Sequence, residues 1–397
     1  MEPSTKRIKL DSSHSTDTTS FQIKSILSDE LLKTIDTVDV YTMSINDSKN
    51  TSEIMLEVNR LLPVPNLQHL KRIKKKDMIL CPVKDVANFL KEDEAFFERV
   101  RHILPDTVPK KSVDETVKWL LDLSSESSSN KSILSEYLRA KGFKEEMTEK
   151  LTTNVTLSPV PSIQPKLRWQ YSIATEQWPC KFHLNKQLEN LYSHNVFNEN
   201  EKNFHIQFME LSLFISSNAN DKSVGVIVDP RNKHIVAVGE TRIDLHPLMH
   251  CSMVLIDMVA RSQNGGAWRE LDISTDHIDD DSFNHNGIDS DIRTLIGTQF
   301  SVKFGAQKPS SVAAPTLLQT NDSTSADNLS KYGPYLCTGY DVYLTDEPCI
   351  MCAMALVHSR ARRIFFHRPN ANGALKTLTK LHTIKALNHH YEVYQIS

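Results

Sequence analysis

The chain has 397 residues, a formal net charge of −3 and a hydrophobic fraction of 39%. This length predicts two or three domains, and the near-neutral charge excludes a uniformly basic nucleic-acid binder, although a local basic patch could still bind phosphates. Six unevenly spaced cysteines do not suit a secreted disulfide framework, the N-terminus lacks the apolar segment of a secretory signal, and no apolar run approaches the ~18 residues that span a membrane. We expect a soluble intracellular protein.

Residues 1–20 are polar and rich in Ser and Thr, which is typical of a disordered tail. They contain three basic residues, Lys6, Arg7 and Lys9, which form either a nuclear import signal or part of a solvated tail. The preceding proline and the Leu-Asp that follows resemble known import signals. We therefore expect the protein in the nucleus as well as the cytoplasm.

Residues 21–150 predict a smaller α/β domain. Strands are expected at 38–43 and 77–81, an amphipathic helix from Ser52 to Leu62, and further helices over 84–150. The first helix ends before prolines, which cannot continue it. Its apolar residues are Ile54, Leu56, Val58 and Leu61.

A concentrated basic run precedes the second of these strands. Lys71, Arg72, Lys74, Lys75 and Lys76 place five positive charges in six positions. Such a run suits the phosphates of a nucleic acid. The alternative is a solvated turn that leads into the strand.

Residues 151–185 predict an interdomain linker, because three prolines stand among Thr, Ser and Asn in its first half. Trp169 and Trp178 follow and indicate a docked segment. Their rings serve either packing, which we favour, or the stacking of bases.

Residues 186–397 predict a second domain with alternating strands and helices. Residues 267–333 interrupt it with eight acidic residues between Glu270 and Asp291 and a tract rich in Ser, Ala, Pro and Thr, so we expect a disordered surface insertion there. The order of elements indicates an α/β sandwich. The expected elements are strands at 224–228 and 235–238, a helix from His246 to Ser262, a strand at 341–345, a helix with Pro348 as its first residue, and a strand at 363–366.

Three residues of this domain have the spacing of a zinc site. Cys349 and Cys352 are three positions apart at the start of a helix, where N–H groups and the helix dipole favour thiolates. His250 lies on another predicted helix, and three protein ligands leave one position for water. For Cys-x-x-Cys alone, the alternatives are a redox pair and a chance occurrence. Cys251 and Cys337 are expected to be buried apolar residues rather than ligands.

The residue that should move protons is missing from this pattern. Zinc deaminases of nucleobases place a Glu two residues after the ligand His, and this chain has Ser252 there. A serine hydroxyl does not titrate near neutral pH, so it cannot carry the proton. Asp257 is about a helical turn too far along, and Glu347 belongs to the motif even where a catalytic Glu is also present.

The residues around the zinc ligands resemble the non-catalytic subunit of the heterodimeric tRNA-specific adenosine deaminases of eukaryotes. The resemblance rests on the segments 246–250, 335–341, 347–360 and 373–389, and also on 67–72. It implies a cytidine deaminase-like α/β/α sandwich at the C-terminus, a bound zinc ion, and a catalytic partner subunit that converts the wobble adenosine of tRNA anticodons to inosine. Such subunits commonly have Val at the position of Ser252.

The resemblance also implies that the N-terminal domain helps to capture tRNA, which favours the phosphate-binding interpretation of the basic run. We therefore expect a pseudo-enzyme subunit whose zinc is structural. The alternatives are a non-enzymatic RNA-binding scaffold with a relic zinc site, and a free-standing deaminase that uses Ser252 with water or a borrowed acid.

Overall fold

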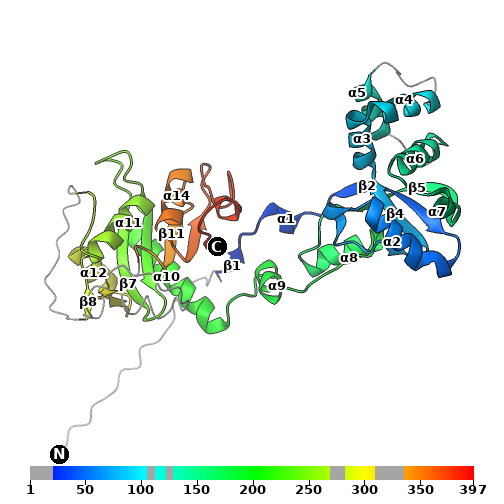
Figure 1. The fold of residues 1–397 in the computed structure, drawn as a ribbon. Coiled ribbons are helices and arrows are strands. Elements are labelled where there is room, and N and C mark those ends of the chain that lie inside the picture. Colours follow the sequence, from blue (N-terminus) through cyan, green and yellow to red (C-terminus); the bar gives the residue numbers. More distant parts are fainter. Residues whose placement is uncertain (1–20, 105–111, 122–127, 269–281, 309–334) are drawn as a thin grey trace, which may run out of the picture. The chain divides into compact units, whose positions relative to one another are not determined.

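The computed structural model describes residues 21–104, 112–121, 128–268, 282–308 and 335–397 (Figure 1). The chain divides into two compact units, one of Asp29–Tyr192 and the other of Ser193–Ser397 together with the start of the chain up to Ser28. The expected import signal, Lys6, Arg7 and Lys9, lies outside the described residues. Among the described helices, none combines the length and the apolar composition needed to cross a membrane.

The unit that contains the C-terminus is built on a seven-stranded sheet with the order β1-β13-β12-β11-β6-β7-β9. Strands β11, β12 and β13 are parallel, whereas β6 is antiparallel to β11 and to β7. All four predicted strands of this domain are confirmed. Its strands are β1 Ile23–Ser25, β6 Val224–Asp229, β7 His234–Glu240, β9 Lys303–Phe304, β11 Asp341–Asp346, β12 Arg363–Arg368 and β13 Glu392–Ile396.

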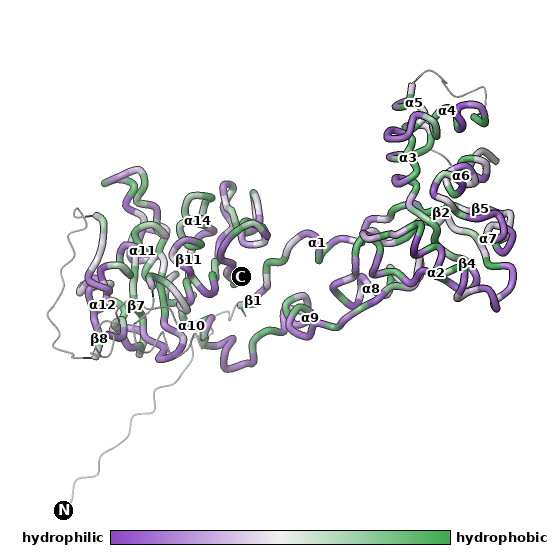
Figure 2. The backbone as a smooth tube through the Cα atoms, viewed as in Figure 1, coloured by the Kyte–Doolittle hydropathy of each residue, from purple (hydrophilic) through white to green (hydrophobic). Residues whose placement is uncertain are grey.

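Helices cover both faces of this sheet, as the alternation of side chains along β11 shows. Tyr343 points to one face, where its hydroxyl contacts Nδ1 of His205 on α10 (Glu199–Asn218) at 2.7 Å. Val342 and Leu344 point to the other face and join a buried cluster with α11 (Cys251–Ser262) and α14 (Ile350–His358). The predicted α/β/α sandwich is therefore confirmed. Hydrophobic residues occur along its strands and the helices that cover them (Figure 2).

The unit of Asp29–Tyr192 has a four-stranded antiparallel sheet with the order β3-β4-β2-β5, so this smaller domain is α/β as predicted. Ile54 and Val58 of α2 are buried, but Leu56 is 73% exposed, which contradicts its expected place on the apolar face. The strands are β2 Thr37–Ile45, β3 Ile73–Lys74, β4 Asp77–Pro82 and β5 Leu151–Pro161. The helices are α1 Asp29–Leu32, α2 Thr51–Leu61, α3 Val83–Glu92, α4 Glu94–Ile103, α5 Val113–Leu121, α6 Ser128–Ala140, α7 Glu145–Glu149, α8 Arg168–Gln177 and α9 Lys186–Tyr192.

The expected linker at 151–185 is wrong over most of its length. Its first eleven residues form β5, which pairs with β2 from Thr37 opposite Pro161 to Ile45 opposite Leu151. Helix α8 follows, and Trp178 is buried with its indole N–H donating to the carbonyl of Lys71 at 2.6 Å, so Trp178 serves packing. The prolines are compatible with β5 because it is an edge strand, where a missing N–H costs no ladder bond.

The expected disordered insertion at 267–333 is also wrong in part. Residues 282–308 form β8 (Phe283–Asn284), α12 (Ser290–Gly297), β9 and β10 (Ala306–Gln307), and β9 extends the main sheet beside β7. Ile288 and Ile296 are fully buried, although the acidic and polar composition of residues 267–333 as a whole suggested no core contribution. Residues 269–281 and 309–334 lie outside the described residues.

Candidate metal centre

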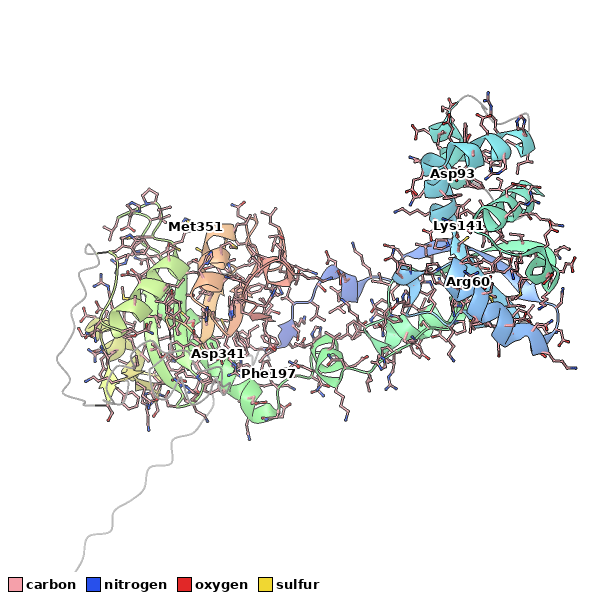
Figure 3. All side chains as sticks on the ribbon, in the orientation of Figure 1. Arg60, Asp93, Lys141, Phe197, Asp341 and Met351 are labelled. Carbon is pink, nitrogen blue, oxygen red and sulfur yellow. The ribbon has the colours of Figure 1, made fainter. Side chains whose placement is uncertain are left out.

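The three predicted ligands come from the starts of two neighbouring helices. His250 is the N-cap residue of α11 and Cys349 is the N-cap residue of α14, both with extended backbone, and Cys352 lies in the first turn of α14. Helix α11 thus begins after His250 rather than at His246, and α14 begins after Cys349 rather than at Pro348. Figure 3 labels Met351, which lies between Cys349 and Cys352 in the sequence.

The ligand atoms of His250, Cys349 and Cys352 all lie within 4.8 Å of one another. The Cys349 sulfur is 3.6 Å from Nδ1 of His250. Cys352 is buried, whereas His250 and Cys349 are half-buried, so the open side of the cluster is next to these two. This group of side chains could hold a metal ion. Cys251 and Cys337 are buried outside it, as expected.

The pKa of the Cys352 thiol lies above its ordinary value, contrary to the expectation for a helix start. Burial and the neighbouring Cys349 raise the pKa of the Cys352 thiol to about 12, although hydrogen bonds from the hydroxyl and the backbone N–H of Ser252 act in the opposite direction. Burial and a second sulfur beside it therefore disfavour the thiolate form of Cys352. A bound cation would reverse this balance.

Ser252 is 3% exposed and lies directly against the ligand Cys352. It lines a pocket of about 200 Å³ beside the three ligands. That volume is below the roughly 300 Å³ at which pockets for small molecules begin. The acidic side chains that line the pocket are Asp346 and Glu347.

Asp346 was not singled out in the sequence. Its carboxylate accepts hydrogen bonds from Arg368 at 2.8 and 3.0 Å, from Ser223 at 2.5 Å and from Thr345 at 2.9 Å. Burial alone would raise the pKa of Asp346, but the bonds from these partners hold it below its usual value. The carboxylate is therefore ionised and fully engaged. Because Arg368 comes from the next strand, no local sequence pattern marks this pair.

Glu347 and Asp257, the other nearby acids, are also engaged. Glu347 is 2% exposed, and its carboxylate accepts five hydrogen bonds from the loop that follows β12. Asp257 pairs with Arg261 at 3.0 Å and accepts the N–H of Ala267. Neither carboxylate is available to replace the missing general acid and base.

The basic run of the other unit separates into two groups. Arg72 is half-buried and donates to the carbonyls of Leu62, Ile79 and Leu80, and Lys74 donates to the carbonyl of Gln177 at the end of α8. The remaining three, Lys71, Lys75 and Lys76, are exposed.

The fold and this site define an α/β/α domain with three side chains placed to hold a metal ion and no free carboxylate in the adjoining pocket. No family model matches the chain. A protein of Danio rerio named probable inactive tRNA-specific adenosine deaminase-like protein 3 is 28% identical over all of this chain and 96% of its own length. Its Homo sapiens counterpart is 28% identical over 94% of this chain and 89% of its own. The tRNA-specific adenosine deaminase TAD3 of Arabidopsis thaliana is 38% identical over 38% of this chain and 34% of its own.

The chain is therefore similar over its full length to tRNA-specific adenosine deaminase-like proteins 3 of animals, which are named probable inactive. A solved structure from a study of tRNA:A34 deaminases matches 48% of this chain and 98% of its own length at 17% identity, with a TM-score of 0.28.

Proposed function

We propose that this protein is the non-catalytic subunit of a heterodimeric tRNA adenosine deaminase, which converts the wobble adenosine of tRNA anticodons to inosine. The proposal rests on one observation, which is that the pocket has no side chain free to carry a proton. Ser252 stands where the proton carrier is needed, and both carboxylates of the pocket wall are engaged. Hydrolytic deamination needs a group that moves a proton from water to the leaving amine, and this pocket offers none.

Zinc is the metal that the three side chains fit best. With zinc bonds of roughly 2.3 Å to sulfur and 2.0 Å to nitrogen, a tetrahedral centre places sulfur and nitrogen about 3.5 Å apart. The distance between Cys349 and His250, 3.6 Å, meets that requirement before any rearrangement. In an active deaminase the metal activates a water molecule. Here His250, Cys349 and Cys352 would use it to join the starts of α11 and α14.

Exposed apolar side chains beside this centre support a partner subunit. Ile243, which lines the pocket, is 57% exposed, Leu245 and Leu248 are 53% and 50% exposed, and Ile350 at the start of α14 is 48% exposed. Four exposed aliphatic side chains on the segments that carry the ligands are typical of a protein interface. Yeast relatives that share shorter segments with this chain are named subunits. We assign the face to the catalytic deaminase subunit.

The second role is to hold tRNA through the unit of Asp29–Tyr192, with the exposed Lys71, Lys75 and Lys76 as phosphate contacts. The basic residues Lys6, Arg7 and Lys9 would direct the protein to the nucleus, in addition to a cytoplasmic pool. Fluorescence microscopy of the full chain with these three residues changed to alanine tests the localisation.

Co-expression with a catalytic deaminase subunit tests the main proposal. The two chains should co-purify, and the complex should form inosine in tRNA transcripts, whereas this chain alone should form none. Cys349→Ala should lower the yield of the complex by weakening the joined helices. Deamination by the isolated chain at a rate unchanged by Cys349→Ala would overturn the proposal.

A further inference from the structure

The unit of Asp29–Tyr192 contains a second pocket, remote in sequence from the metal centre, with a volume of about 370 Å³. That volume is within the range of sites for small molecules. Leu67 and Leu70 give it apolar walls, the amides of Asn59 and Gln68 are at its edge, and Arg72 and Lys181 supply positive charge. Figure 3 labels Arg60, which neighbours Asn59 on α2.

Arg72 brings an uncompensated charge into this pocket. Its Nε and Nη2 atoms donate to the carbonyls of Ile79 at 2.7 Å and of Leu62 and Leu80 at 2.8 Å, so it ties the end of α2 to β4. Among the described residues, no carboxylate pairs with Arg72, and burial lowers its pKa to about 10. Its Nη1 atom is neither bonded nor among the buried unpaired atoms, so it remains open to a ligand.

Lys181 adds a second charge from a distant part of the sequence. Its backbone N–H donates to the carbonyl of His69 at 2.6 Å, and the N–H of Lys71 donates to Pro179 at 2.8 Å, so Leu70 and Cys180 form an antiparallel bridge. Lys181 lines the pocket together with Leu70, whereas Lys71 is not part of its lining. Both are exposed, and neither ammonium group has an ion-pair partner among the described residues.

We infer that this pocket binds an unpaired nucleotide of RNA, with the phosphate between Arg72 and Lys181 and the base against the leucine walls. The inference deepens the proposed tRNA-binding role and rests on it. Unpaired nucleotides are the parts of an RNA whose base edges a protein can read, and the amides of Asn59 and Gln68 are suited to those edges. Lys75 and Lys76, in the turn before β4, contact the flanking backbone.

The test is tRNA binding by the full-length chain, measured by fluorescence anisotropy over a series of salt concentrations. Lys181→Glu should weaken binding about tenfold and lower the salt slope by about 1, the value expected for one lost phosphate contact. Gln68→Trp should fill the pocket and weaken binding to a similar extent without changing the charge. The matched control is Lys118→Glu on α5, an exposed lysine outside the pocket, which should change affinity less than twofold.

The outcomes separate the pocket from the general role. If Lys181→Glu and Gln68→Trp bind tRNA like the unmodified chain while Lys75→Glu weakens binding, the pocket inference is wrong and the tRNA-binding role stands. If the full chain binds tRNA no better than Lys75→Glu does, the tRNA-binding role itself fails. Circular dichroism melting of each variant excludes loss of folding as the cause, and Arg72 is left unchanged because it also supports the fold.

Discussion

Glu347 offers the sharpest test of the claim that the acids near the metal centre are structural. Its Oε1 atom accepts the backbone N–H groups of Leu375 at 3.0 Å, Lys376 at 2.6 Å and Thr377 at 3.0 Å. Its Oε2 atom accepts the N–H of Asn370 at 3.2 Å and the hydroxyl of Thr377 at 2.5 Å. One carboxylate thereby fixes the loop from 370 to 377, which lines the metal pocket.

Glu347→Ala removes the acceptor for all five donors. A hydrogen bond to a charged group contributes about 1.5–3 kcal/mol to stability. Only the bond from Leu375 is fully buried, and the other donors can bind water in the variant. We therefore expect the free energy of unfolding to fall by roughly 4 kcal/mol. For a folding unit of roughly 150–250 residues, such as the unit that contains Glu347, that corresponds to a fall of roughly 8–16 °C in Tm. Glu347→Gln keeps the shape and one acceptor oxygen, and should lose about half as much.

Thermal unfolding of the full chain, followed by circular dichroism, measures this effect. Inosine formation by the complex, assayed at a temperature where both variants are folded, should remain close to that of the unmodified complex. If Glu347→Gln abolished deamination while Tm stayed within about 1 °C, Glu347 would be a catalytic acid and our account of the site would be wrong.

The ionisation of Glu347 should also make the stability of the protein depend on pH. Burial raises the pKa of Glu347, but the hydrogen bonds from Thr377, Asn370 and Lys376 outweigh it and hold the pKa below the ordinary value. A carboxyl whose pKa is depressed by folding stabilises the protein above its unfolded pKa of about 4.3, and this contribution is lost as the pH falls through the folded value. The gap in stability between the unmodified chain and Glu347→Gln should therefore narrow below roughly pH 4.3. A constant gap down to pH 3 would contradict the assignment.

Three further predictions concern the C-terminal unit. Cys352→Ser should reduce bound zinc, measured by plasma mass spectrometry, from about one per chain to well below one, and chelation should lower the Tm of the unmodified chain but not of this variant. Ser252→Glu should give no inosine or ammonia in the isolated chain, and measurable turnover would show that a working substrate pocket remains. Arg363→Met should lower the free energy of unfolding, measured with denaturant, by about 3–5 kcal/mol. The reason is that the carboxylate of Asp341, which is 0% exposed, would lose the bonds of 2.6 and 2.9 Å that it accepts from Arg363. A loss under 1 kcal/mol would refute the importance of this pair.

The sequence was informative where the determining interactions are local. Cys349 and Cys352 are three residues apart at the start of a helix, so their convergence follows from helical geometry alone, and His250 completed a spacing that few other sites share. The strands of the sandwich were equally visible, because β6 and β11 are short and built around consecutive apolar residues.

The features that the sequence did not reveal depend on tertiary contacts. The prolines of β5 suggested a linker because an edge position in a sheet cannot be read from composition. Lys181 comes close to the basic run that begins at Lys71 only because Leu70 and Cys180, which lie far apart along the chain, form a bridge. Asp346 is engaged by Arg368 from the neighbouring strand. Each case requires knowledge of which segments become neighbours.

In the non-catalytic subunit that we propose, Ser252 connects the absence of an acid/base residue with the presence of the three candidate metal ligands. Its hydroxyl donates to the sulfur of Cys352, which a carboxylate cannot do and would oppose through like charge. In an active deaminase that repulsion is accepted because the carboxylate carries the proton. If catalysis belongs to a partner, as we propose, a small neutral donor can stabilise the thiolate instead. The centre can then act as a junction between α11 and α14 beneath the exposed aliphatic face of Ile243 and Ile350, where rigidity matters more than access for a substrate.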